Sequence, residues 1–404
     1  MSRDIVQLAD SRTMPTYKRL PVTFVRGDGM RLYDHSGRDY LDFVAGIAVN
    51  ALGHSHPAVV SAISEQAGKL IHTSNLYYTG PMAELADRLC GLLGWDDGRV
   101  FFANSGAEAN ECAFKLVRRW AGDRYGANRY GTIAAFGAFH GRTLETLAAT
   151  GQPAKWKPFL PMPAGFTHVE FDHRGALEDA ITGAESSILL EPVQGEAGVI
   201  VPADDYLPFA RELCDDNNLA LILDEVQTGL GRTGEMFGFQ HTGAVPDVIT
   251  LAKALGNGLP IGACVARGEF AEAFQAGDHA TTMGGNALAC AVALAVIDAI
   301  ESEGLVANSR QMGTYLMQQL QELAGRQPAV TEVRGKGLLL ALQLDSECAS
   351  DAVLACLEKG LLVNNVSPTA LRLCPPLILT KADCDEAVGI LDEVLTSLRE
   401  VQPA

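Results

Sequence analysis

Six short, predominantly apolar runs constrain the fold of this chain more than any other feature. They cover residues 99–103, 131–136, 187–191, 219–225, 247–252 and 261–266. The segments between them include stretches with the periodicity of helices. A strand that is apolar on both faces must be covered on both faces, and helices between such strands are the crossovers of a parallel sheet. The pattern therefore predicts an α/β fold whose mostly parallel sheet is covered by helices.

The pattern changes after residue 300, which indicates a second domain. Before that point, helices are expected at 57–70, 81–93, 107–120 and 286–300. After it we expect a helix at 305–324, a hairpin within 330–344, a helix at 350–359, strands at 361–364 and 371–374, and a helix at 381–397. A chain of 404 residues is too long for one simple core. We predict a large domain over 51–300, a smaller α+β domain over 301–404, and an N-terminal segment, 1–50, associated with the small domain.

Charge and cysteine content narrow the class of protein. The net charge of −18 disfavours nucleic acid and anionic membranes as partners. The N-terminus has no apolar signal segment, and the most apolar run, 286–300, is too short to span a bilayer. Nine cysteines without a C-x-x-C pair favour buried free thiols. We expect a cytoplasmic enzyme that acts on small molecules.

Two motifs suggest other chemistry and are set aside. His54 and His56 could bind a metal, but no third ligand lies near them in the sequence. The run "GLGRTG" at 229–234 fits a dinucleotide fingerprint, which requires a helix directly after the glycines. The residues that follow contain Gly238, Gly243 and Pro246 and make a poor helix. Neither a metal nor a dinucleotide is predicted.

An acid and an amine lie at the ends of two expected strands. Asp224 ends the run 219–225, and Lys253 follows the run 247–252. In parallel sheets the carboxyl ends of strands form the ligand-binding edge. An internal Asp–Lys ion pair would satisfy both charges, and a cofactor that needs both groups is the alternative.

A third segment suits an anion. Ser105, Gly106 and Ala107 begin the helix expected at 107–120, where free amides and the helix dipole favour a phosphate. Taken alone, these residues also fit an ordinary helix cap. Pyridoxal phosphate needs a lysine for its aldehyde, an acid for its ring nitrogen and an anion site for its phosphate. Lys253, Asp224 and residues 105–107 supply one each.

Six blocks of the sequence resemble class III (ornithine/acetylornithine-type) aminotransferases of PLP fold type I. They are "NSGAEANE", "AFHGRT", "EPVQGEAG", "DEVQTGLGRTG", "LAKALGNGLPIGA" and "TTMGGNALA", in the family's order and spread over nearly the whole chain. The resemblance implies a homodimer with shared active sites.

The resemblance also implies residue roles, carried over position by position. Lys253 would hold pyridoxal 5′-phosphate and move the proton between Cα and C4′, and Asp224 would pair with the ring nitrogen. The other implied cofactor contacts are Ser105, Gly106 and Ala107 at the phosphate, Gln227 at the ring hydroxyl, Phe139 and Val226 on the ring faces, and Thr282 at the partner subunit's phosphate.

Four residues would contact substrate by the same resemblance. Arg142 would hold the α-carboxylate as a bidentate partner, and Thr281 would contact substrate beside it. Glu196 would mask Arg372 in one half-reaction and release it to bind a carboxylate of glutamate or 2-oxoglutarate in the other. Gly46 stands where ornithine aminotransferases have a tyrosine, which leaves room for an acylated amine.

The expected reaction is transfer of the δ-amino group of N2-acetyl-L-ornithine to 2-oxoglutarate, giving N-acetyl-L-glutamate 5-semialdehyde and L-glutamate. Succinylornithine, ornithine and 4-aminobutyrate stay open as amino donors. An aminomutase is a remoter alternative, because it would not need the Glu196–Arg372 pair for an exchanging donor.

Overall fold

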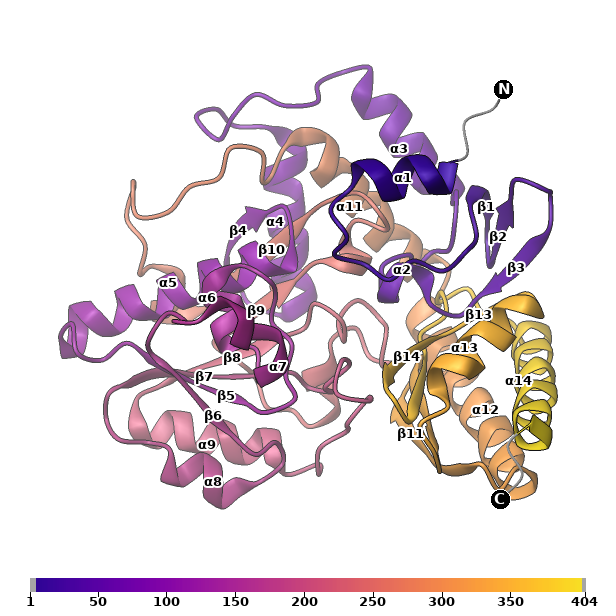
Figure 1. The fold of residues 1–404 in the computed structure, drawn as a ribbon. Helices are drawn as coiled ribbons and strands as arrows, with labels where there is room; N and C mark the ends of the chain where they lie inside the picture. Colours follow the sequence, from indigo (N-terminus) through magenta and orange to yellow (C-terminus); the bar gives the residue numbers. More distant parts are fainter. Residues whose placement is uncertain (1–4, 402–404) are drawn as a thin grey trace.

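A seven-stranded sheet lies at the centre of the computed structural model, which describes residues 5–401 (Figure 1). Its strands, in the order β4-β10-β9-β8-β7-β5-β6, are β4 (Arg99–Ala103), β10 (Gly262–Ala266), β9 (Val248–Leu251), β8 (Ala220–Asp224), β7 (Glu185–Leu190), β5 (Gly131–Ala135) and β6 (Phe166–Val169). Strand β10 runs antiparallel to both of its neighbours, and the pairs from β9 to β6 are parallel. The predicted mostly parallel α/β sheet is therefore confirmed.

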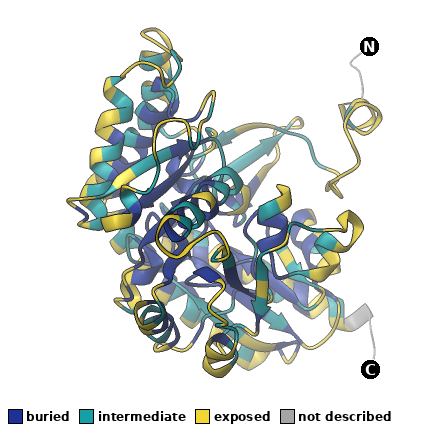
Figure 2. Ribbon diagram, turned by 90° about the vertical axis from the view of Figure 1, so that its left-hand side faces the viewer, coloured by how far each residue is buried: buried dark blue, intermediate teal, exposed yellow. Residues whose placement is uncertain are grey.

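Helices cover the large sheet. The four that the sequence predicted here begin within one residue of the predicted starts, and the other helices were not predicted. The full set is α3 (Pro57–Ala67), α4 (Gly80–Leu93), α5 (Gly106–Tyr125), α6 (Leu144–Ala149), α7 (Pro153–Trp156), α8 (Arg174–Asp179), α9 (Tyr206–Asn217), α10 (Gly268–Ala271) and α11 (Ala287–Ser302), with 3-10 turns η1 (Lys157–Phe159), η2 (Gly238–His241) and η3 (Lys253–Leu255). Every residue of β7, β8 and β9 is buried, as their continuous apolar sequences require. Figure 2 shows buried sheet residues beneath helices that are exposed only on their outer faces.

A separate sheet lies in the C-terminal part of the chain, at the right of Figure 1. Its antiparallel order is β11-β12-β15-β14, with β11 (Val330–Lys336), β12 (Leu339–Leu344), β14 (Asn364–Ser367) and β15 (Ala370–Leu373). Three helices belong to this region: α12 (Leu305–Arg326), α13 (Ala349–Glu358) and α14 (Lys381–Val401). Strand β15 places Arg372, fully buried, toward the large sheet's ligand edge.

The N-terminal segment joins the C-terminal part through a small sheet. It contains α1 (Ile5–Arg12), β1 (Phe24–Asp28), β2 (Arg31–Asp34), β3 (Asp39–Asp42) and α2 (Ala45–Ala48), and β3 pairs in parallel with β13 (Leu361–Leu362). The domain boundaries at residues 50 and 300 stay a prediction. Within residues 5–401, no helix has both the length and the apolar character needed to cross a membrane.

Candidate active site

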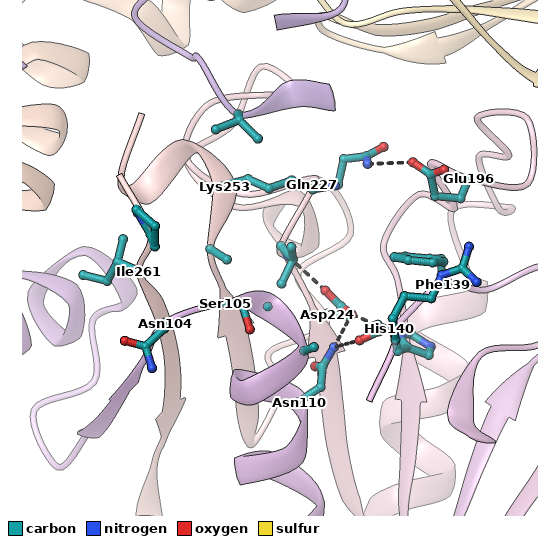
Figure 3. A pocket seen from close by; sticks show the side chains of 18 of the residues that line it. Asn104, Ser105, Asn110, Phe139, His140, Glu196, Asp224, Gln227, Lys253 and Ile261 are labelled. Carbon is teal, nitrogen blue, oxygen red and sulfur yellow. Dashed lines mark hydrogen bonds and ion pairs between the residues drawn. The ribbon is translucent and has the colours of Figure 1, made fainter. Parts of the chain in front are cut away.

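Lys253 and Asp224 meet at the C-terminal edge of the parallel strands. Asp224 is the last residue of β8 and pairs in register with Thr250 of β9, and Lys253 begins the 3-10 turn that follows β9. Both side chains line a cavity of ≈ 410 Å³ (Figure 3). The sequence prediction that the acid and the amine lie at adjacent strand ends is therefore correct.

Asp224 is held by three donors at the base of this cavity. Its Oδ2 atom accepts hydrogen bonds from His140 Nδ1 and Asn110 Nδ2, each at 2.8 Å, and its Oδ1 atom accepts the Val226 N–H at 3.0 Å. Asn110 is fixed in turn, because its Oδ1 atom accepts the Thr250 hydroxyl at 2.8 Å. The carboxylate is 4% exposed, so these donors replace the water that it loses. His140 and Asn110 were not predicted.

Lys253 is an amine without a partner. Within residues 5–401 its ammonium makes no hydrogen bond or ion pair, which excludes the internal Asp224–Lys253 pair as the reason for these two charges. Burial lowers the pKa of Lys253, and Arg372 lowers it further, while Glu196 and Asp224 oppose the change. Its backbone φ is 44°, an uncommon value for lysine that costs about 1–3 kcal/mol.

The start of α5 also lines the cavity, and it offers free backbone amides. Ser105 caps the helix by accepting the Glu108 N–H at 3.2 Å, so its hydroxyl is used. The amides of Gly106 and Ala107 have no acceptor among the described residues, as expected in a first helical turn. A Cβ added to Gly106 would lie 2.9 Å from both methyl groups of Val226, so glycine lets that side chain close over the helix start.

Phe139 forms the other side of the pocket. Its N–H donates to Glu191 Oε2 at 3.0 Å, and the Arg142 guanidinium lies over its ring, 5.6 Å from the centroid. Burial raises the pKa of Glu191 well above its ordinary value, and the Asp224 carboxylate raises it further. Glu191 therefore favours the neutral acid.

Glu196 and Arg372 form an ion pair at the upper rim of the cavity (Figure 3 shows Glu196 with Gln227). Arg372 Nη1 also donates to the Gly195 carbonyl at 3.1 Å and to Gln227 Oε1 at 3.3 Å, and Gln227 Nε2 donates to Glu196 Oε1 at 3.3 Å. Burial favours a higher pKa for Glu196, but the positive charges of Arg372 and Lys253 outweigh it and lower the pKa to about 2. The buried Nη2 atom of Arg372 keeps an unused donor among the described residues.

The comparisons with known proteins agree with this geometry. The family model "Aminotransferase class-III" matches residues 13–395. This chain belongs to the class-III aminotransferases. A class-III aminotransferase of Caldanaerobacter subterraneus subsp. tengcongensis, named acetylornithine aminotransferase, is 50% identical over 386 residues, which is 96% of this chain and 98% of that protein. A protein of the same name from Methanocaldococcus jannaschii is 49% identical over 397 residues, 98% of each chain.

Solved structures support the same fold. The ornithine aminotransferase of Toxoplasma gondii has a TM-score of 0.94 at 32% identity, covering 98% of this chain and 95% of that one. The acetylornithine aminotransferase of Elizabethkingia anophelis has a TM-score of 0.87 at 34% identity, covering 97% of this chain and 98% of that one. The chain is thus a pyridoxal-phosphate-dependent aminotransferase, and another structure of the T. gondii enzyme is described with the cofactor at its active site.

Most of the residues predicted for this aminotransferase site do come together. The cavity is lined by Ser105, Gly106, Ala107, Phe139, Arg142, Glu196, Asp224, Val226, Gln227 and Lys253. Thr281 and Thr282 lie outside it: Thr281 Oγ1 accepts from Asn104 Nδ2 at 3.4 Å, and Thr282 is exposed. Arg372 reaches the cavity only through Glu196 and Gln227. The prediction missed Asn104, Asn110, His140 and Glu191, which also line the cavity. Asn110 lies in α5 and the other three lie in loops, and no local sequence pattern marks any of them as part of the site.

The residues present fit pyridoxal phosphate. A buried amine without a partner, a buried carboxyl group held by three donors and two free amides at a helix start lie around one cavity. Lys253 would bind the aldehyde, Asp224 the ring nitrogen, and Gly106 with Ala107 the phosphate. Each of these groups would otherwise leave a charge or donor unsatisfied inside the protein.

Proposed function

We propose that this aminotransferase moves the δ-amino group of N2-acetyl-L-ornithine to 2-oxoglutarate, as a step of arginine biosynthesis. The products are N-acetyl-L-glutamate 5-semialdehyde and L-glutamate. The observation that carries the proposal is the arrangement of cations at the cavity: Arg142 has no carboxylate partner among the described residues, whereas Arg372 is masked by Glu196. A donor with one carboxylate and an acceptor with two require this combination.

Each residue of the site has a separate role in catalysis. When bound, pyridoxal phosphate supplies the carbonyl that takes up the amino group and a ring that withdraws electrons from the neighbouring carbon. Asp224, which three hydrogen-bond donors hold in place, would face the ring nitrogen and favour its protonated form. Lys253, whose pKa is lowered by burial, moves the proton at the amine-bearing carbon. Phe139 and Val226, which line the cavity, would pack against the two faces of the ring.

Substrate carboxylates would bind at the two arginines in turn. Arg142 holds the α-carboxylate of the acylated ornithine while Glu196 keeps Arg372 neutralised. When the dicarboxylate enters, Glu196 leaves, and the free Nη2 donor of Arg372 receives the second carboxylate. Gly46 lies in a turn with φ 65° and lines a neighbouring cavity of ≈ 470 Å³, which supports an acyl group as the feature that distinguishes the donor.

The assembly and location belong to the same proposal. We expect a homodimer in which Thr282 binds the phosphate in the partner subunit, with Thr281 beside it at the substrate. The exposure of Thr282 and of Met283, which is 61% exposed, supports a surface that a second copy covers. A cytoplasmic location is supported by nine unpaired cysteines.

A comparison of substrates tests the function. With 2-oxoglutarate as acceptor, kcat/KM should be highest for N2-acetylornithine and lower for succinylornithine, ornithine and 4-aminobutyrate, with L-glutamate as the measured product. A higher value for any of the other three would reassign the donor. Rearrangement of a semialdehyde without 2-oxoglutarate would instead identify an aminomutase.

A further inference from the structure

The exchange at Arg372 leaves Glu196 with an unbalanced charge. The Arg372 side chain is fully buried and that of Glu196 is 23% exposed, so their separation strands a carboxylate in a poorly solvated place. Breaking such a pair without a substitute is strongly unfavourable, because it leaves an uncompensated charge inside the protein. The released Glu196 therefore needs a second cation. This argument rests on the proposed function, which makes Glu196 leave Arg372.

Lys155 is a cation without a carboxylate partner beside this site. It lies on α7, and its ammonium is 4.7 Å from the centroid of the Phe139 ring. Within residues 5–401 its ammonium makes no ion pair and no hydrogen bond, although the side chain is only half-exposed. An unpaired lysine can form an ion pair with a new carboxylate without first breaking an existing pair.

The loop that leads into α7, and so to Lys155, and the loop that carries Glu196 both lie against the segment around Gly137. Gly137 donates to the Gly151 carbonyl at 2.8 Å and accepts from Gln152 Nε2 at 2.9 Å, which fixes the loop just before α7. On its other side, a Cβ added to Gly137 would lie 2.7 Å from Gln194 Oε1 and 3.1 Å from Ala197 Cβ. The segment around Phe139 thus lies between the two loops, and Figure 3 shows Phe139 on the same side of the pocket as Glu196.

The charged groups around Lys155 also favour Glu196 as its partner. Burial lowers the pKa of Lys155, and among the charged groups Glu196 acts on it most strongly, in the opposite direction. Glu191 also favours the charged amine, while Arg142 and Arg372 disfavour it. An approaching carboxylate would therefore stabilise the charged form of Lys155.

We propose that Lys155 is the alternate ion-pair partner of Glu196, which receives its carboxylate when Arg372 opens for a dicarboxylate. The other two candidate cations are engaged: Lys253 serves the cofactor, and Arg142 holds the substrate carboxylate. Lys155 thereby determines how readily the site accepts a dicarboxylate after a monocarboxylate donor. It is a positioning residue, because it acts on the substrate only through Glu196.

Ligand binding to the cofactor-loaded protein tests this role. Glutarate represents the dicarboxylate and pentanoate the monocarboxylate, and calorimetry gives both Kd values. Lys155→Met should raise the Kd of glutarate about five- to tenfold, the size expected for a lost ion pair that is half-buried, and leave that of pentanoate unchanged. Lys155→Arg should restore glutarate binding. Lys157→Met, an exposed lysine two residues away, is the matched control and should change neither value.

A second variant separates this role from simple packing. In a Glu196→Gln background no carboxylate needs a new partner, so Lys155→Met should have no further effect on glutarate. The same loss in both backgrounds, or an equal loss for pentanoate, would overturn the proposal. If the wild type binds glutarate no better than pentanoate, the two-carboxylate site of the proposed function fails; if it does bind glutarate better and Lys155→Met is silent, only the role of Lys155 fails.

Discussion

The role of Arg142 can be tested with two substrates that differ in one group. N2-Acetylornithine and N-acetylputrescine share the amine and the acetamide, and only the first has the α-carboxylate. Arg142 is exposed, and within residues 5–401 its guanidinium makes no hydrogen bond or ion pair and lies over the Phe139 ring, 5.6 Å from the centroid. Arg142→Ala should therefore change the free energy of unfolding by no more than about 0.5 kcal/mol.

The size of the effect follows from the kind of contact that is lost. A hydrogen bond between charged groups contributes about 1.5–3 kcal/mol, which corresponds to about a 10- to 150-fold loss in kcat/KM. Arg142→Ala should show this loss with N2-acetylornithine. With N-acetylputrescine the loss should stay within about twofold, since only the weak contact with the Phe139 ring disappears.

Steady-state assays with saturating 2-oxoglutarate and varied amine give the two ratios. Arg142→Lys keeps the charge but loses the planar fork, so it should lie between the wild type and Arg142→Ala for N2-acetylornithine. Equal losses for the two amines would refute the assignment, because the carboxylate would then make no difference to what Arg142 does.

Three further changes test the rest of the site. Lys253→Ala should abolish the visible absorbance of lysine-bound cofactor and the transamination activity together; a retained band would assign the cofactor to another lysine. Glu196→Gln should lower the free energy of unfolding at pH 7 by about 3 kcal/mol, because the charged pair holds the pKa of Glu196 at about 2 instead of 4.5. The folded-state pKa is the lower one, so this stabilisation is complete above about pH 5 and is lost as pH falls toward 2, and denaturant curves of the two proteins should converge on acidification. Gly106→Ala should raise the cofactor Kd, because its Cβ would lie 2.9 Å from the valine packed against it, whereas Gly122→Ala on the same helix, with no atom within 4 Å of its Cβ, should not.

The sequence predicted best those residues whose position depends on a single helix or strand. Continuous apolar runs predicted strands β7, β8 and β9, and their parallel order placed Asp224 and Lys253 at one edge. The strand–turn–helix pattern at 101–115 likewise predicted a helix that starts at residues 105–107, and α5 begins at Gly106. Each of these predictions needs only local pattern and the general rule for parallel sheets. Strand β6 was missed because the edge strand Phe166–Val169 is only partly buried and lacks a continuous apolar run.

Contacts between distant segments could not be predicted in this way. His140 and Asn110 converge on Asp224 from a loop and a helix that are 84 and 114 residues away in sequence. Neither side chain differs, in sequence, from an ordinary buried histidine or asparagine. Their function depends on which carboxylate each of them meets, and the packing of α5 on the sheet decides that.

The separation of Asp224 from Lys253 is what makes the pair useful. Had they formed an ion pair, the lysine would have been held protonated and the acid neutralised, and neither could serve another group. Instead, His140 and Asn110 satisfy the acid from below, while a left-handed backbone at Lys253 directs the amine into the cavity without a partner. The strain at Lys253 and the burial of Asp224 both oppose folding, so the surrounding sheet must stabilise them. A ligand that uses both groups at once explains why the fold keeps an arrangement that opposes its own stability.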